Sequence, residues 1–100
     1  MASQVPAASQ FAVYGPTFLD VVMGPLDGPP VPGREAWVEG ALMCAGGAAN
    51  QAIALARLGA PVRLHSRVGV DQMGQFVDEM LACEGVDTSS CERVGDQNVT

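Results

Sequence analysis

Hydrophobic residues alternate with polar ones in some segments of the chain and recur at helical spacing in others. Residues 11–14 form a short apolar run that ends at Gly15-Pro16, which predicts a buried strand followed by a turn. Residues 62–68 alternate between a mostly apolar set of side chains and a set of arginine and histidine side chains, which predicts a strand with one polar face. His65 belongs to that polar face, and its context indicates a solvated side chain rather than a catalytic one.

Two segments have the composition and the boundaries of helices. Residues 48–58 are rich in alanine and are followed by Gly59 and Pro61, so a helix is expected there, with alanines that let it lie close to a sheet. Asp71 is placed to cap a second helix, which Gly85 ends. The apolar positions of this second helix form one amphipathic stripe: Met73, Phe76, Val77, Met80 and Leu81.

The rest of the chain predicts irregular structure and short strands. Residues 24–33 contain four prolines and three glycines, which excludes a helix and predicts a loop with edge-strand pieces. Strands are expected at 37–39 and 41–44, a loose leader at 1–10, and the start of another strand at 98–100. Strands that alternate with helices predict a mostly parallel sheet, and two helices are too few to cover both of its faces. We therefore expect part of a larger α/β domain.

The composition is globular and excludes several kinds of chemistry. The 100 residues are 48% hydrophobic and 16% charged, which is enough for one small domain and is not typical of disorder. All five basic residues are arginines, and the absence of lysine excludes a P-loop lysine, a Schiff base and a Ser–Lys dyad. The net charge of −6 argues against nucleic acid as a partner.

The cysteines and the first basic residue bear on location. The three cysteines, Cys44, Cys83 and Cys91, predict neither a disulfide framework nor a zinc site, and we expect buried or half-buried thiols in a reducing compartment. The first basic residue is Arg34, which is too late for a secretory signal. The longest run without polar side chains, residues 40–49, is too short to cross a bilayer. The sequence thus predicts a soluble, cytoplasmic protein without a membrane partner.

Two features are expected beyond the carboxyl ends of strands, where open α/β sheets bind ligands. Asp20 is either a turn-capping residue or a carboxylate that accepts hydrogen bonds from adjacent sugar hydroxyls. Gly46 and Gly47 allow close backbone approach at a helix start, and Asn50 in the first turn offers a donor and an acceptor. The alternative for this loop is a tight strand-to-helix turn without a ligand.

Together these residues resemble the N-terminal part of a carbohydrate kinase of the PfkB (ribokinase-like) family. The resemblance extends from about residue 13 to residue 100. Its strongest part is the string AGGAANQA at 45–52, followed by Gly59 and Gly69 at the spacing of the family's first signature. Three further stretches agree with the family pattern, ALARLG, VGVDQMG and GVDTS.

The resemblance implies a three-layer α/β fold with a mostly parallel sheet and a small β lid, here residues 21–44 of a partial kinase domain that covers 1–100. It implies that Asp20 binds sugar hydroxyls and that Gly46, Gly47 and Asn50 line the same substrate pocket. Phe18 stands where ribokinase-type members carry a polar sugar ligand, and the glycine loop has no lysine, which weakens a specific ribose assignment.

The resemblance also implies a reaction, the transfer of the γ-phosphoryl group of ATP, with Mg²⁺, to a hydroxyl of a sugar or nucleoside. The family's aspartate base lies in a Gly-Ala-Gly-Asp-like motif of the C-terminal part, which would follow Thr100, so this chain alone is expected to be inactive. The alternative is a stand-alone binding or dimerisation module derived from the lid. In that case Trp37, Val38 and Leu42 would supply an apolar patch, and a homodimer through the lid is expected.

Overall fold

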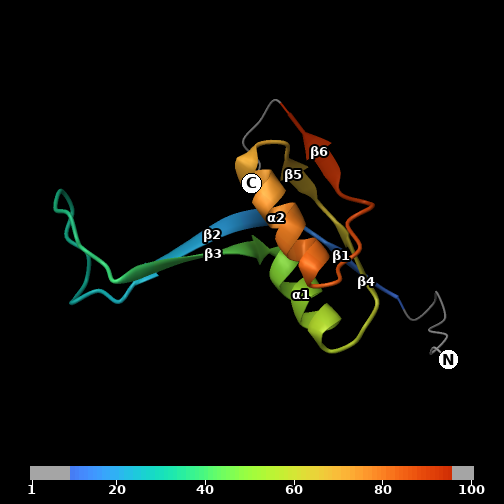
Figure 1. Ribbon diagram of the computed structural model, residues 1–100, viewed down its shortest axis with the longest axis horizontal. Coiled ribbons are helices and arrows are strands. Elements are labelled where there is room, and N and C mark those ends of the chain that lie inside the picture. The colour runs from blue at the N-terminus through green and yellow to red at the C-terminus, as the bar shows by residue number, and fades with distance from the viewer. Residues whose placement is uncertain (1–9, 96–100) are drawn as a thin grey trace.

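The computed structural model describes residues 10–95 of the chain (Figure 1). The expected leader, apart from Gln10, and the expected strand at 98–100 lie outside the described residues. The elements in chain order are β1 (Phe11–Tyr14), β2 (Thr17–Gly24), β3 (Gly40–Gly47), α1 (Ala48–Arg57), β4 (Val62–His65), β5 (Arg67–Gly69), α2 (Gln72–Cys83) and β6 (Glu92–Val94).

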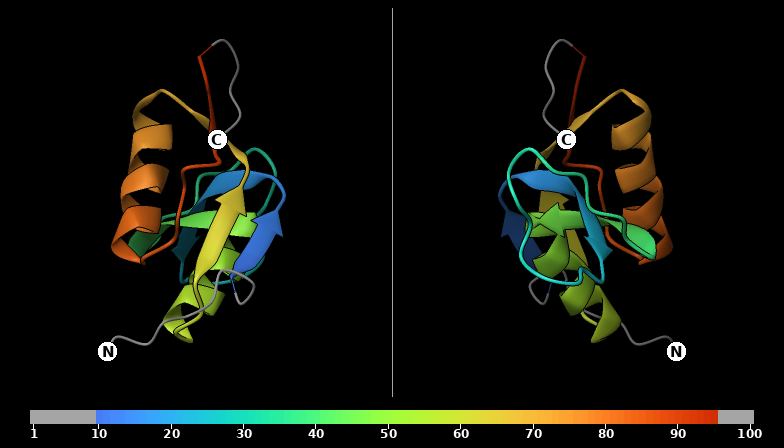
Figure 2. Two further views of the ribbon diagram at one scale, coloured as in Figure 1. Left: turned by 90° about the vertical axis from the view of Figure 1, so that its right-hand side faces the viewer. Right: turned by 90° about the vertical axis from the view of Figure 1, so that its left-hand side faces the viewer.

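The strands form three pairs, two of which are parallel. β1 pairs with β4 and β5 pairs with β6 in parallel, whereas β2 and β3 form an antiparallel hairpin. Figure 2 shows β1 and β4 side by side and pointing in the same direction. The predicted α/β class with a mainly parallel sheet is therefore confirmed outside the hairpin.

The single strand expected at 62–68 is divided at Ser66, so that prediction was wrong. β4 pairs with β1 and β5 pairs with β6, and Ser66 lies at the change of partner. Its hydroxyl donates to the carbonyl of Gly15 at 2.6 Å and lies 2.8 Å from the hydroxyl of Thr17. These contacts between residues distant in the sequence fix the position at which the strand is divided, and no local sequence pattern encodes them.

Two other strand predictions need correction. Residues 37–39 are not a strand, because pairing of β3 with β2 begins only at Gly40, opposite Gly24. Asp20 lies inside β2, opposite Cys44, rather than in a turn after the first strand. β6 was not expected, since residues 92–94 carry no apolar alternation and pair only with β5.

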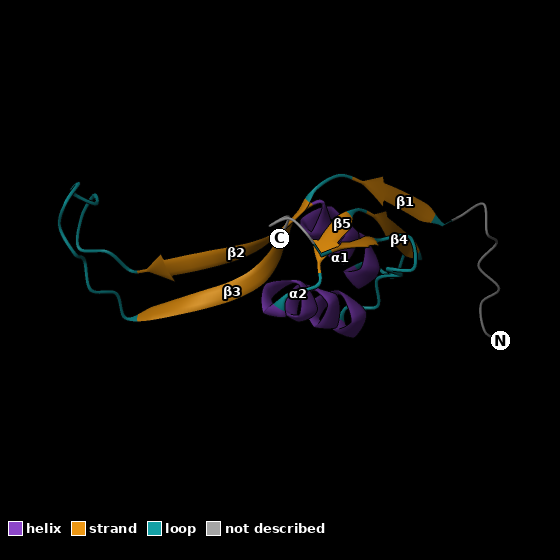
Figure 3. Cartoon of the chain, turned by 90° about the horizontal axis from the view of Figure 1, so that it is seen from above, coloured by secondary structure: helices purple, strands orange, loops and turns teal. Residues whose placement is uncertain are grey.

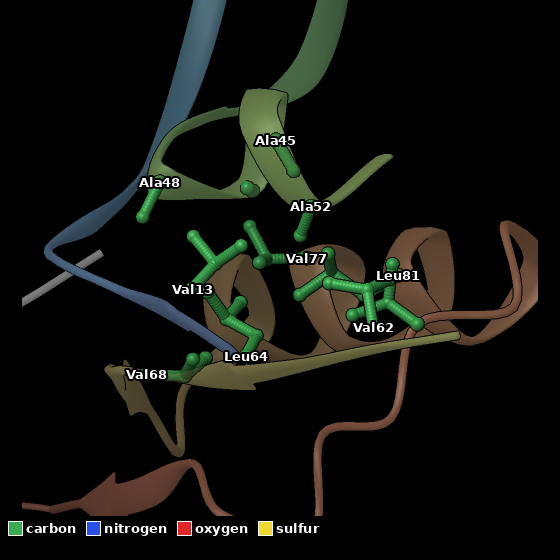
Figure 4. Packing of buried hydrophobic residues seen from close by; sticks show 11 residues of the cluster. Val13, Ala45, Ala48, Ala52, Val62, Leu64, Val68, Val77 and Leu81 are labelled. Carbon is green, nitrogen blue, oxygen red and sulfur yellow. The ribbon is translucent and has the colours of Figure 1, made fainter. Parts of the chain in front are cut away.

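One small core joins the parallel strands to the two helices (Figure 4). The fully buried residues of α1 are alanines, so its backbone packs close to the strands, as predicted, and the partly buried Ile53 and Leu55 pack against the cluster. Val77 and Leu81 of α2 are fully buried in the same cluster. The complete cluster contains Val13, Ala45, Ala48, Ala49, Ala52, Val62, Leu64, Val68, Val77, Leu81 and Val86.

The ends of α2 follow the sequence pattern, but its apolar stripe is shorter than expected. Asp71 accepts a hydrogen bond from the Gly74 amide at 2.9 Å, as an N-cap does, and Gly85 follows the helix with a φ of 82°. Met73 was expected in the core and is 54% exposed. Gly74 is buried instead. It packs so close to Gly69 that an added Cβ would lie 1.8 Å from the Gly69 carbonyl oxygen.

The sheet face opposite the core carries paired polar groups. His65 was expected to be solvated, but it is partly covered by Tyr14, whose ring stacks on it with centroids 4.2 Å apart. Arg63 and Asp87 form an ion pair of 3.0 Å. The cysteines are unpaired, and Cys83, the last residue of α2, is exposed, contrary to the expectation. Neither helix of the described region is long and apolar enough to span a bilayer.

The β2–β3 hairpin projects far from the two helices (Figures 1 and 3). Its strands pair without interruption from Thr17 opposite Gly47 to Gly24 opposite Gly40. The chain therefore measures 56 Å along its longest axis and 18 Å along its shortest. The segment 21–44, expected as a lid, is the outer part of this hairpin.

Asp87 makes the stability of the fold depend on pH. Hydrogen bonds from Ser89 and from Arg63 lower the pKa of Asp87 from its ordinary 3.8 to about 2. A carboxyl whose pKa is lower in the folded state stabilises the fold above its unfolded pKa. That contribution disappears as the pH falls through the folded pKa.

We therefore expect Asp87→Asn to be less stable than the wild type at pH 6, with a difference that shrinks as the pH falls from about 4 to about 2. Urea unfolding at several pH values measures this. Asp27→Asn, in the exposed hairpin loop, is the control and should show no such trend. A difference for Asp87→Asn that is constant with pH would contradict the assignment.

Candidate functional site

The candidate site lies where the hairpin joins the rest of the molecule. The end of β3 and the start of α1 meet at Gly46 and Gly47, and β2 runs beside them. Cross-strand pairing places Phe18 opposite Gly46 and Asp20 opposite Cys44. Residues 18 and 20 project from the same face of β2, because side chains alternate along a strand.

The Asp20 carboxylate lies directly over the backbone of Gly46. A Cβ added to Gly46 would be 2.0 Å from Oδ2 and 2.4 Å from Cγ of Asp20, so no side chain fits there. Asp20 itself is half-buried and Gly46 is buried. The glycine therefore lets a carboxylate sit against the peptide backbone while part of it stays open to solvent.

Gly47 makes the sharp turn from β3 into α1. Its φ of 65° lies in the left-handed region, and an added Cβ would be 2.4 Å from the carbonyl oxygen of Pro16. The amide of Ala48 donates to that same carbonyl at 2.8 Å, and no side chain caps the start of the helix. The turn thus places the positive end of α1 next to the site, although its first two residues, Ala48 and Ala49, are buried.

Asn50 lies in the first turn of α1, and its side chain is exposed. The structure places Asp20 against Gly46, and Gly47 follows in the chain, whereas no hydrogen bond joins Asn50 to Asp20 within residues 10–95. The sequence-based assignment of all four residues to one ligand site remains a prediction.

A hollow of about 690 Å³ opens beside this turn, at the carboxyl ends of β1 and β4. Phe18 lines it and also contacts Gly47, so this residue links the hollow to the candidate site. The other lining residues carry no sequence signal of a binding site, and the Gly15-Pro16 turn is the one local signal near them. They are Tyr14, Gly15, Pro16, Thr17, His65, Ser66, Arg67, Ser90 and Glu92.

The acidic and thiol side chains of the described region do not gather into a metal site. No group of three or more His, Cys, Asp or Glu residues within 10–95 is arranged to hold a metal ion. The Arg67 guanidinium in the hollow is paired with Glu92 at 3.0 Å. The site residues therefore offer one carboxylate, an amide side chain and backbone groups, which suit hydroxyl groups better than a metal.

Comparison with known proteins gives a consistent set of relatives. The pfkB family carbohydrate kinase model matches residues 37–100. The 2-dehydro-3-deoxygluconokinase of Bacillus subtilis is 46% identical over 56 residues, which are 56% of this chain and 17% of that protein. The ribokinase of Haemophilus influenzae is 42% identical over 52 residues, which are 52% of this chain and 17% of that protein.

Solved structures agree with these relatives. Ribokinase from Cryptococcus neoformans in complex with ADP has a TM-score of 0.75 and 36% identity, over 91% of this chain and 29% of that one. Fructokinase from Xylella fastidiosa with bound ATP has a TM-score of 0.72 and 30% identity, over 91% and 28%. This chain therefore has part of a ribokinase-like α/β fold and spans less than a third of the length of these relatives.

The contact between Asp20 and Gly46 can be tested by a double-mutant cycle. We expect Gly46→Ala to lower the free energy of unfolding by about 1–3 kcal/mol, because the new methyl group overlaps the carboxylate. In an Asp20→Ala background most of that cost should disappear, since the overlapping group is gone. Urea unfolding measures both values.

Gly40→Ala is the matched control in the same strand, because nothing lies within 4 Å of its added Cβ. Its effect should be the same in both backgrounds. An equal cost of Gly46→Ala with and without the Asp20 carboxylate would show that the two residues are not in contact.

Proposed function

Because this chain belongs to the PfkB family of carbohydrate kinases, we propose that it forms the sugar-binding part of an ATP-dependent kinase that phosphorylates a hydroxyl of a sugar or nucleoside. The observation that carries the proposal is the Asp20 carboxylate held over Gly46, next to the start of α1. The chain spans only part of its relatives, so the substrate and the complete activity belong to the proposal.

Asp20 is suited to hold a sugar by two adjacent hydroxyls. An ionised carboxylate accepts from two O–H donors at once, and such charge-assisted bonds are stronger than neutral ones. Because Gly46 and Gly47 have no side chains, the Asp20 carboxylate and the Phe18 ring lie directly over this turn, where they would face the sugar. Asn50 would then add one donor and one acceptor near the start of α1.

When bound, ATP with Mg²⁺ supplies the phosphoryl group that is transferred. The described residues do not fit such a group, because they contain neither a metal-binding cluster nor a lysine. We therefore assign to this chain the positioning of the sugar. The nucleotide, the metal and the aspartate base are assigned to parts of the domain beyond residue 100, so the chain alone is expected to be inactive.

The outer hairpin, residues 21–44, would act as a lid over the bound sugar. Closure of an apolar cover excludes water and so limits loss of the phosphoryl group to hydrolysis. The exposed apolar side chains Val22 and Leu42 project from the same face as Asp20 and would form the inner surface of this cover. A cytoplasmic location, where ATP is available, is part of the same proposal.

Asp20→Asn in the full-length kinase tests the role of the carboxylate. We expect KM for the sugar to rise about 10- to 100-fold, because a charge-assisted pair of hydrogen bonds is weakened. KM for ATP should change little. Steady-state kinetics with each substrate varied in turn measures both constants.

Glu79→Gln removes an acid from the exposed side of α2 and is the control. It should leave both KM values unchanged. If KM for the sugar is unchanged in Asp20→Asn, Asp20 does not bind the sugar. If only KM for ATP changes, Asp20 belongs to the nucleotide site instead.

A second candidate function is the dimerisation module, and the exposed hairpin supports it. Trp37 is 91% exposed, and Val21, Met23 and Met43 are 48%, 61% and 43% exposed on the face away from Asp20. A two-stranded hairpin with apolar side chains on both faces is not stable alone in water. A second copy of the chain would cover the outer face and leave the Asp20 face for a sugar.

Light scattering separates this candidate from the kinase. The full-length protein should be a dimer, and Val21→Glu with Met43→Glu should make it monomeric, because two charges would be buried at the interface. Gln75→Glu on the exposed side of α2 is the control. A monomeric wild type excludes the dimer, and a dimer that phosphorylates no sugar or nucleoside favours the module over the kinase.

A further inference from the structure

Met80 of α2 makes a polar contact with the backbone of β3. Its sulfur accepts a hydrogen bond from the Ala45 amide at 3.1 Å. Ala45 is 2% exposed, so the interior of the protein rather than water has to supply an acceptor for this amide. A buried N–H group without an acceptor is unfavourable, and the Met80 thioether therefore fixes the helix and the strand relative to each other at this residue.

The contact lies on the edge of β3 that no strand covers. The other edge of β3 pairs with β2 along the whole hairpin. N–H groups alternate in direction along an antiparallel strand, and the Ala45 amide is directed at α2. Within residues 10–95 no further strand pairs with β3. The sulfur of Met80 thus takes the place of a strand partner at this point of the edge.

This edge contact immediately precedes the glycine pair. Ala45 is followed by Gly46, over which the Asp20 carboxylate lies, and a Cβ added to Gly46 would be 2.0 Å from Oδ2 of Asp20. Ala45 also stands opposite Leu19, the residue before Asp20. A displacement of β3 at Ala45 would therefore move both the glycine beneath the carboxylate and the strand that carries it.

The helix itself is held in place without the sulfur of Met80. Val77 and Leu81 of α2 are fully buried in the core, whereas Met80 is only partly buried against it. Leucine would fill nearly the same volume as methionine but has no acceptor, so the hydrogen bond is what distinguishes methionine at this position. Met80 also lines a surface hollow of about 320 Å³ together with Phe76, Glu79, Cys83 and Glu84.

We propose that Met80 is a positioning residue for the sugar site: by accepting from Ala45 it holds β3 where Gly46 and the Asp20 carboxylate meet the ligand. This inference rests on the proposed function, in which Asp20 binds the sugar. Met80 acts through the backbone of β3 and not by contact with the sugar. Loss of its acceptor should weaken binding of the sugar and leave binding of ATP, which is assigned to other parts of the domain.

The size of the effect is limited by the pairing that remains. A misplacement of about 1 Å in a site can reduce the rate by about 100-fold. Without the Met80 acceptor, β3 would still be paired with β2 from Gly40 to Gly47, which restricts its movement. We therefore expect a rise of about three- to tenfold in KM for the sugar.

The experiment compares Met80→Leu with Met80→Gln in the full-length kinase. A panel of pentoses, hexoses, sugar acids and nucleosides with ATP first identifies a substrate that the wild type phosphorylates. Leucine removes the acceptor, whereas the glutamine side chain has a similar length and its amide oxygen accepts from an N–H group. Met73→Leu, at a 54% exposed position of the same helix, is the matched control. The measured quantities are KM for the substrate, KM for ATP, and the hydrogen-exchange rate of the Ala45 amide by NMR.

Met80→Leu should raise KM for the sugar about three- to tenfold and speed exchange of the Ala45 amide about fivefold, with KM for ATP within about twofold of the wild type. Met80→Gln should bring both affected values back to within about twofold, and Met73→Leu should change neither. If Met80→Gln does not fold, Met80→Leu combined with Asp20→Asn replaces it. The effect of Met80→Leu on KM for the sugar should then be less than about twofold, because both residues act through the same carboxylate.

The outcomes distinguish the inference from the function on which it rests. An unchanged exchange rate of the Ala45 amide in Met80→Leu overturns the contact and with it the inference. Faster exchange with an unchanged KM for the sugar overturns the positioning role and leaves the kinase intact. An equal rise in KM for the sugar and for ATP also overturns it, because a general loss of structure would then be the cause. A wild type that phosphorylates no member of the panel overturns the proposed function and the role of Met80 in it, while the exchange rates still show whether the contact exists.

Discussion

The close approach of β2 to the turn between β3 and α1 is the constraint on which the other features of the site depend. Gly46 and Gly47 leave room for the Asp20 carboxylate, the Phe18 ring and the Pro16 carbonyl within the same small volume. If either glycine carried a side chain, β2 would move away from the start of α1. The hairpin direction, the helix start and both candidate ligand contacts are therefore set by two residues without side chains.

The small core and the long hairpin are two consequences of this arrangement. The core contains alanines from α1 and a few branched residues, and it ends at Ala45, one residue before the glycine pair. Beyond that point the hairpin has no layer packed on either face, and its apolar side chains are exposed. The body thus packs against the base of the hairpin, while the outer part is exposed on both faces.

Sequence patterns predicted what is encoded locally and missed what depends on distant partners. Both helices, the Asp71 cap and the terminal glycines follow from short-range signals and are present. The break at Ser66 was missed, because it depends on the pairing of β4 and β5 with different strands and on contacts with Gly15 and Thr17. Local pattern also does not show that Met73, although in phase with the stripe, faces solvent.

The same difference between locally encoded features and those that depend on distant residues applies to the site. The composition of residues 45–50 predicted a glycine turn at a helix start, and Asp20 was singled out as an acid among apolar residues. Their contact could not be predicted, because it depends on the register that sets Asp20 opposite Cys44. The hollow was missed for a similar reason, since its walls come from five strands and the loops between them.

The ion pairs of the described body engage its arginines with acids other than Asp20. Four arginines of the described body each pair with an acid: Arg57 with Glu84, Arg63 with Asp87, Arg67 with Glu92 and Arg93 with Asp78. No arginine of that body is thus left to compensate an anionic substrate beside Asp20. With one carboxylate and one phenyl ring lying over adjacent glycines, the part of the proposed site within residues 10–95 offers a ligand one charged acceptor and one apolar surface.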